Sequence, residues 1–210
     1  MLTRLCLIRH GETDWNVIAR LQGWIDIPLN SLGMQQAAAA AATLQGRHFD
    51  ALYSSDLSRT RMTAEPISAG LGLAIRSEPR LRERNLGLLQ GLTPAEADAQ
   101  YPAAYGRLKS RRPDYEPPGG ESVDVFASRV GAVLDEVLAH HAGQSVLIVT
   151  HGGVLDMLYR LASNIPFHVE RTWRLGNGAL NWLQHDGTAW SVTSWDDKAH
   201  LRVAGDERAA

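Results

Sequence analysis

Short apolar runs alternate along the chain with longer segments of helical periodicity. Residues 5–8 and 145–149 form apolar runs too short for helices, and each is followed within three residues by a histidine and a glycine. We interpret both as fully buried strands, with shorter strands at 51–53 and 73–75. The segments with helical character are residues 34–44, 59–68, 93–96, 121–140 and 155–161.

Three of these segments carry specific helix signals. Within 121–140, apolar residues recur mostly three and four positions apart, which is typical of a helix with one buried face. Thr93-Pro94-Ala95-Glu96 has the pattern of a capping box with proline in the first turn. Residues 34–44 include six consecutive alanines, the best helix formers, whereas Pro66 is expected late in its helix or at a kink.

Strands that alternate with helices predict a mainly parallel sheet covered on both faces. Near the end of the chain, residues 179–184 and 189–195 flank Asp186-Gly187, a dipeptide that favours a hairpin turn. We therefore predict an α/β fold, a three-layer α/β/α sandwich whose mainly parallel central sheet has an antiparallel edge strand. Residues 111–120, rich in proline and glycine, are expected to form a loop.

Length and composition narrow the function classes. The 210 residues fit one domain, 1–210, and 44% hydrophobic with 21% charged residues is an ordinary globular composition. A net charge of −2 gives no global signature of nucleic-acid binding. Cys6 is expected in the core, residues 204–210 are expected to fray, and no transmembrane or signal segment is evident. We predict a cytoplasmic protein without a nucleic-acid or membrane partner, and leave open whether it forms a homodimer.

Polar residues follow three of the predicted strands. Arg9-His10, Ser54-Ser55-Asp56 with Arg59, and Thr150-His151 all stand at carboxyl ends, where open α/β sheets bind ligands. Arginine forks suit phosphate, and Gly152-Gly153 before a helix would add backbone N–H groups and a positive helix end. The sequence therefore predicts an oxyanion pocket, most naturally for phosphate.

Other chemistries fit the sequence less well. Two histidines could bind a metal, but the chain has no His-Glu-x-x-His or Cys-x-x-Cys motif, and Arg9 beside His10 disfavours a cation. No Gly-x-Ser-x-Gly elbow or glycine-rich nucleotide loop occurs. We predict neither a metal nor a cofactor.

Five sequence segments stand out as motifs: LIRHGETDWN at 7–16, SSDLSRTRMTA at 54–64, LRERNLG at 81–87 continuing to Gly91, GES at 120–122 and VTHGG at 149–153. In this order they resemble the histidine phosphatase superfamily, which includes the cofactor-dependent phosphoglycerate mutases. Arg-His-Gly alone would be a weak signal, but five ordered motifs are specific, and the resemblance runs from about residue 5 to residue 165.

The resemblance implies a role for each site residue. His10 would be the nucleophile that becomes phosphohistidine, attacking as a neutral imidazole whose pKa is lowered by Arg9 and Arg59 and whose other ring nitrogen a backbone carbonyl holds. Arg9, Arg59 and His151 would bind the phosphoryl oxygens, with Asn16 as a neutral donor and Gly152 as a further phosphate-binding residue. Glu83 would be the general acid and then the base that activates water. Without the motif, a surface salt bridge of Glu83 with Arg82 or Arg84 would be the simpler interpretation.

A phosphatase and a mutase share this pocket. The family's mutases carry extra residues between the Glu83-type and Glu121-type motifs, whereas only 38 positions separate those residues here. Mutases also have an arginine pair that binds the substrate carboxylate. Arg111-Arg112 imitates this pair, but Pro-Pro-Gly-Gly-Glu-Ser follows closely, as in the short phosphatase branch. We predict a phosphomonoester hydrolase, with a phosphoglycerate mutase as the alternative and Arg111-Arg112 as a solvated loop or lid.

A non-catalytic phosphate-binding module is a third hypothesis, because a fold alone does not fix function. Such a module would lack the nucleophile or the acid, and both His10 and Glu83 are present. The substrate is expected to be a small phosphate ester, for example a phosphosugar, a phosphoglycerate, a nucleoside monophosphate or α-ribazole phosphate. Residues 88–119 are expected to cover the pocket and to select among them.

Overall fold

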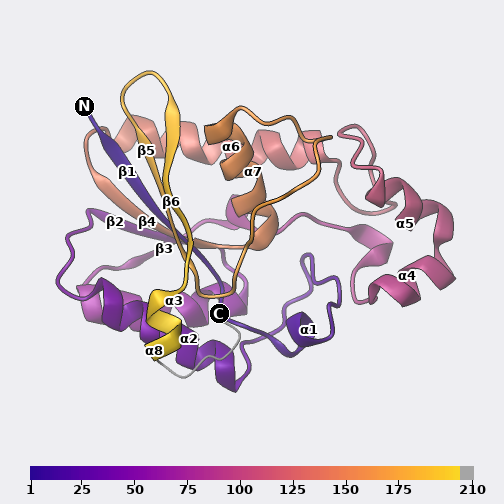
Figure 1. The fold of residues 1–210 in the computed structure, drawn as a ribbon, viewed down its shortest axis with the longest axis horizontal. Helices are drawn as coiled ribbons and strands as arrows, with labels where there is room; N and C mark the ends of the chain where they lie inside the picture. The colour runs from indigo at the N-terminus through magenta and orange to yellow at the C-terminus, as the bar shows by residue number, and fades with distance from the viewer. Residues whose placement is uncertain (204–210) are drawn as a thin grey trace.

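The computed structural model describes residues 1–203 and is built on one six-stranded sheet (Figure 1). The strand order is β3-β2-β4-β1-β5-β6; β1 to β4 are parallel, and β5 pairs antiparallel with both β1 and β6. This confirms the mainly parallel sheet with an antiparallel end, and the hairpin across Asp186-Gly187. The strands are β1 (Thr3–Arg9), β2 (Ala51–Ser54), β3 (Ile75–Ser77), β4 (Ser145–Thr150), β5 (Leu180–His185) and β6 (Trp190–Asp197).

Helices cover both faces of the sheet, as predicted. One layer contains α6 (Val123–His140) and α7 (Gly152–Ser163), and the other contains α2 (Ser31–Leu44) and α3 (Ser58–Leu71), with the short α8 (Ala199–Val203) against α2. Five shorter elements lie outside these layers: α1 (Asp14–Val17), α4 (Pro94–Gln100), α5 (Pro102–Lys109) and the 3-10 turns η1 (Pro79–Leu81) and η2 (Gly87–Leu89). In Figure 1, α4 and α5 lie well away from the sheet.

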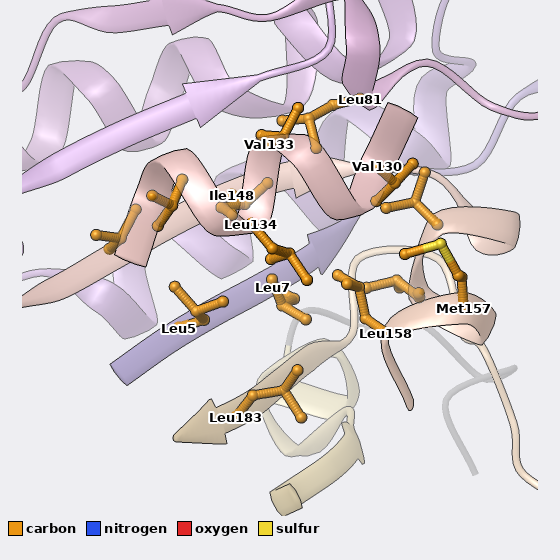
Figure 2. Close-up of a cluster of buried hydrophobic side chains, with 14 of the residues drawn as sticks. Leu5, Leu7, Leu81, Val130, Val133, Leu134, Ile148, Met157, Leu158 and Leu183 are labelled. Carbon is orange, nitrogen blue, oxygen red and sulfur yellow. The ribbon is translucent and has the colours of Figure 1, made fainter. Parts of the chain in front are cut away.

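Strand alternation divides the core into two clusters. In β1, Leu5 and Leu7 face α6 and α7, whereas Cys6 and Ile8 face α2 and α3, and all four are fully buried. Figure 2 shows Leu5 and Leu7 beneath Val130 and Leu134 of α6, together with Leu158 of α7. Burial on both faces explains why the strand is uniformly apolar, and Cys6 is a core residue as expected.

The structure corrects three predicted boundaries. The strand predicted at 73–75 is at 75–77, because α3 continues to Leu71 and ends with Gly72 in the left-handed region (φ 67°). The helix predicted at 59–68 is α3, which ends three residues later at Leu71, with Pro66 late in the helix as expected and buried Ala64 and Ile67 packed against the sheet. Helix α2 begins earlier than predicted, at Ser31, because the Asn30 side chain accepts a hydrogen bond from the N–H of Gly33.

The other helix predictions hold with small shifts. The capping box at Thr93 and Glu96 is present at the start of α4, and the buried stripe of α6 begins after Ser122, the N-cap. Residues 111–120 contain no helix or strand, as predicted. The expected fraying of 204–210 concerns residues outside the described range. Within 1–203, no helix combines the length and apolarity required to cross a bilayer.

Candidate functional site

The carboxyl ends of three neighbouring strands bring the predicted residues together. His10 follows β1, Ser55 follows β2 and His151 follows β4, and the two imidazole centroids are 5.3 Å apart in an edge-to-face arrangement. Arg59 donates from Nε to His151 Nδ1 at 3.2 Å, and His151 Nε2 lies 2.9 Å from Ser55 Oγ. A guanidinium can only donate, so Nδ1 accepts, and the proton of a neutral His151 is on Nε2.

A backbone carbonyl orients His10, as predicted. Its Nδ1 lies 2.7 Å from the Gly11 oxygen, which can only accept, so Nδ1 carries the proton and Nε2 keeps its lone pair. Gly11 packs so closely on Gly33 that a Cβ atom at position 11 would lie 2.4 Å from the Gly33 oxygen. Asn177 Nδ2 also donates to the His10 carbonyl at 2.9 Å. The backbone on both sides of the imidazole is thus fixed.

Both imidazoles are held in their neutral form. Burial lowers the pKa of His10 well below its usual value, and the nearby Arg59 and Arg9 charges lower it further. For His151 the causes of the lowered pKa are burial, then Arg59, His10 and Arg9. The predicted effect of the arginines on His10 is present, but burial, which the sequence argument did not weigh, is the larger cause.

A cavity of about 160 Å³ lies in front of His10. Arg9, Asn16, Arg59 and Glu83 also line it, whereas His151 and Gly152 do not. His151 is fully buried behind the cavity, in contact with His10 and Arg59. The structure therefore places the predicted cations, the nucleophile candidate and the acid candidate around one small space.

Two of the three arginines that line the cavity, Arg9 and Arg59, are firmly held next to His10. Arg59 is fully buried and donates to the carbonyls of Gly23 and Ile25. Burial lowers its pKa to about 10, so it stays charged at neutral pH. Arg9 donates to the Leu175 carbonyl at 2.5 Å, while its buried Nε has no partner among the described residues. An unpaired buried N–H costs free energy, and an oxyanion in the cavity would satisfy it.

Asn16 presents a donor to this space. Its Oδ1 accepts from the Thr13 N–H, the Thr13 hydroxyl and Asn177 Nδ2. Because the carbonyl end of the amide is used within the protein, the NH₂ end remains for a ligand. This geometry agrees with the neutral-donor role predicted for Asn16.

Two backbone N–H groups hold the carboxylate of Glu83. Gly153 donates to Oε2 at 2.9 Å and Arg84 donates to Oε1 at 2.8 Å. The alternative of a surface salt bridge is wrong, since the Arg82 side chain pairs with Asp56 and that of Arg84 donates to two carbonyls. The carboxyl group of Glu83 lies instead at the N-terminus of α7, where backbone N–H groups fix its position.

This contact also changes the role that was predicted for Gly152-Gly153. The N–H of Gly153, predicted to be free for an oxyanion, is bound to Glu83. A Cβ atom at position 153 would lie 2.0 Å from Glu83 Oε1, so only glycine allows the carboxylate this close to the helix. The second glycine of the motif therefore positions the carboxyl group of Glu83, the acid candidate.

Sequence reasoning did not identify the residues that support Glu83. Arg129 of α6 donates to the carbonyls of Arg80, Arg82 and Glu83, and forms a two-bond pair with Glu121 at 2.6 and 2.9 Å. Arg129 falls outside all five motifs, so only its place on α6 beside the buried stripe could have indicated it. Asn177 was also missed, because no local pattern marks its loop.

The Arg111-Arg112 pair separates in the structure. Arg112 pairs with Asp114 at 2.8 Å on the exposed surface, whereas Arg111 donates to the Val169 carbonyl at 3.4 Å and lines a cavity beside Glu83. The two side chains do not act on one site. Among residues 1–203, no group of three or more His, Cys, Asp or Glu could hold a metal ion.

Comparisons with known proteins agree with this geometry. The model of the histidine phosphatase superfamily (branch 1) matches residues 5–198. Phosphoglycerate mutase-like protein 4 of Arabidopsis thaliana is 38% identical, with 96% of this chain and 88% of that protein covered. The metal-independent phosphoserine phosphatase of the same plant is 37% identical, with 97% of this chain and 85% of that protein covered.

A solved structure of a mycobacterial glucosyl-3-phosphoglycerate phosphatase is similar as well. Its TM-score is 0.83 and its sequence identity 32%, with 94% of this chain and 100% of that chain covered. The family model, the relatives and the fold thus agree on one family. The chain belongs to the histidine phosphatase superfamily, branch 1.

Proposed function

We propose that this chain hydrolyses small phosphate monoesters through a phosphohistidine formed on His10. The single observation that carries the proposal is the state of His10: Nδ1 is held by the Gly11 carbonyl, and burial and cations keep the imidazole neutral. The lone pair on Nε2 is thereby available beside a cavity lined by Arg9 and Arg59. The nucleophilic nitrogen of His10 and the arginines that would bind an oxyanion therefore line the same cavity.

In the first step, Nε2 of His10 forms a bond to phosphorus as the ester P–O bond breaks. Arg9 and Arg59 stabilise the charge on the non-bridging oxygens, and the NH₂ of Asn16 adds a neutral donor. Glu83 gives a proton to the leaving oxygen, which departs as an alcohol. His151, hydrogen-bonded to Arg59 and against the ring of His10, positions both residues.

In the second step, water replaces the alcohol. Glu83, now a carboxylate, takes a proton from the water as its oxygen attacks phosphorus, and the P–N bond breaks. Inorganic phosphate leaves and Nε2 of His10 recovers its lone pair. The backbone N–H groups of Gly153 and Arg84 would hold the carboxyl group of Glu83 in place, first as the acid and then as the carboxylate.

The separation of Arg111 and Arg112 favours a phosphatase over the mutase alternative. A mutase must retain its phosphorylated intermediate and return the phosphoryl group to it, and the family resemblance assigns carboxylate binding to an arginine pair. Here Arg112 is bound to Asp114 and turned to solvent. A phosphatase named for phosphoserine is among the similar proteins, as is a mutase-like protein, so both activities belong in the test.

The test is a trapping experiment with ³²P-labelled esters. We expect acid-labile, base-stable label on the protein, and neither label nor turnover with His10→Ala. A panel of phosphate esters is assayed for phosphate release beside a 3-phosphoglycerate mutase assay. Label that persists in His10→Ala, or that appears on serine, would contradict the proposal, and isomerisation faster than phosphate release would establish the mutase instead.

A further inference from the structure

The indole of Trp24 contacts the backbone of Glu83. Its Nε1 donates to the Glu83 carbonyl at 2.7 Å, and the Arg129 guanidinium donates to the same oxygen at 2.8 Å. A carbonyl oxygen has two lone pairs, so both are occupied. Two donors from different segments of the chain therefore fix the direction in which this carbonyl points.

The carbonyl of Glu83 and the N–H of Arg84 belong to one peptide group. Because a peptide group is planar and trans, these two bonds point in opposite directions. On one side the oxygen accepts from Trp24, and on the other the N–H donates to Glu83 Oε1 at 2.8 Å. Rotation of this peptide would break both hydrogen bonds. The place of the carboxyl group thus depends on an indole at the opposite side of the peptide.

Two guanidinium groups hold the indole ring in this orientation. The guanidinium carbon of Arg82 lies 5.0 Å from the centroid of the ring, and that of Arg129 lies 5.9 Å from it. Cations at these distances are attracted by the π electrons of tryptophan. Arg82 is paired with Asp56 and Arg129 with Glu121, so neither guanidinium is free to turn away. The ring is therefore held, although 37% of Trp24 is exposed.

The backbone around Trp24 is bound to the oxyanion site. Arg59 donates to the carbonyl of Gly23 at 2.8 Å and to that of Ile25 at 2.9 Å, one on each side of Trp24. The N–H of Trp24 donates to Gln90 Oε1 at 2.6 Å. This segment therefore joins an arginine of the oxyanion site to the peptide that holds the acid candidate.

We propose that Trp24 is a positioning residue for the general acid, because its indole N–H sets the direction of the Glu83–Arg84 peptide and thereby the place of the Glu83 carboxyl group. The inference rests on the proposed phosphatase activity. Among residues 1–203, Trp24 lines neither of the two cavities that Glu83 borders, so it acts through Glu83 and not on the substrate. It should matter for the step that needs a proton on the leaving oxygen. Binding of the phosphoryl oxygens should not need the indole, since main-chain carbonyls hold Arg59.

The test is Trp24→Phe, which keeps an aromatic ring next to Arg82 and removes the N–H donor. Single-turnover phosphorylation of His10 by an alkyl ester should slow about fivefold, the effect of one hydrogen bond. Phosphorylation by nitrophenyl phosphate, whose leaving group needs no proton, should change less than about twofold. The inhibition constant of inorganic phosphate should stay the same. Urea unfolding of each variant shows that the fold is retained.

The same substitution in a Glu83→Gln chain separates positioning from a general structural role. If Trp24 acts through the acid, Trp24→Phe should cause no further loss with the alkyl ester there, because no acid is left to position. Trp195→Phe is the matched control, since it also removes an indole N–H that donates to a backbone carbonyl, that of Arg174 at 3.0 Å. It should leave the ratio of alkyl to aryl rates unchanged.

Three results would overturn the role of Trp24 while label still forms on His10. They are an unchanged ratio of alkyl to aryl rates in Trp24→Phe, an equal change of this ratio in Trp195→Phe, and a further fivefold loss in the Glu83→Gln chain. Absence of both label on His10 and phosphate release in the wild-type chain instead refutes the proposed function, and the role of Trp24 with it.

Discussion

Replacement of Arg129 by methionine tests whether the segment around Glu83 is held from behind. Arg129 touches no cavity in front of His10, but its guanidinium donates to three carbonyls between Arg80 and Glu83 and to the carboxylate of Glu121. Methionine keeps an apolar stem against Phe126, whose ring lies 4.8 Å from the guanidinium carbon. The substitution therefore removes the hydrogen bonds and the charge more than the packing.

The expected loss of stability follows from burial. The Arg129 and Glu121 side chains are only 16% and 9% exposed, so Arg129→Met leaves a buried carboxylate without its cation. Breaking a buried pair of this kind costs about 3–5 kcal/mol of unfolding free energy. In a chain of this size, each kcal/mol lost lowers Tm by roughly 2–4 °C. The double variant Glu121→Gln with Arg129→Met should lose less unfolding free energy than the sum of the two single variants, because it has no buried carboxylate without a cation.

Arg129 would also affect the chemistry by positioning Glu83. Single-turnover phosphorylation of His10 by an alkyl ester, which needs a proton on the leaving oxygen, should slow about tenfold or more, and phosphorylation by nitrophenyl phosphate much less. Urea unfolding and rapid quench provide the two measurements, with Arg112→Met, an exposed arginine, as the control. An unchanged free energy of unfolding, or equal slowing with both esters, would refute the reasoning.

Three further predictions concern the groups at the cavity. Glu83→Gln should slow the single-turnover phosphorylation of His10 by an alkyl ester about 10²-fold, and phosphorylation by an aryl ester far less. Equal rate losses with the two esters would make Glu83 a positioning residue. Because His10 and His151 have lowered pKa values in the fold, the unfolded chain binds more protons below pH 6.5. Stability should therefore fall on acidification, by about 1.4 kcal/mol per pH unit for each histidine, in urea titrations from pH 7 to 5, and His10→Gln should remove its share. Since Arg9 and Arg59 supply the positive charge, phosphate release should survive EDTA, and a loss restored by a divalent ion would contradict this.

The sequence predicts most of the fold and the convergence of the site, because both depend on patterns within a short window. An apolar run that ends in Arg9-His10, and another that ends in Thr150-His151, are sufficient to place two imidazoles at one sheet edge. The N–H of Gly33 that Asn30 caps, and the continuation of α3 from residue 68 to Leu71, depend on contacts made only after packing. Those are the boundaries that the pattern misplaced.

The sequence does not show which group each charged side chain binds. Arg82, Glu83 and Arg84 are consecutive, and their pattern alone suggests neighbours that pair with one another. In the fold, Arg82 reaches Asp56, Arg84 reaches backbone carbonyls, and the carboxylate of Glu83 is bound by the Gly153 N–H, seventy positions away.

The same divergence occurs at Arg111 and Arg112, where a left-handed residue turns adjacent side chains to different surfaces. Backbone direction at such turns decides which charges meet, and residue identity does not encode it. A sequence motif can therefore name the candidate acid of this site, while the groups that hold its carboxyl group become visible only in three dimensions.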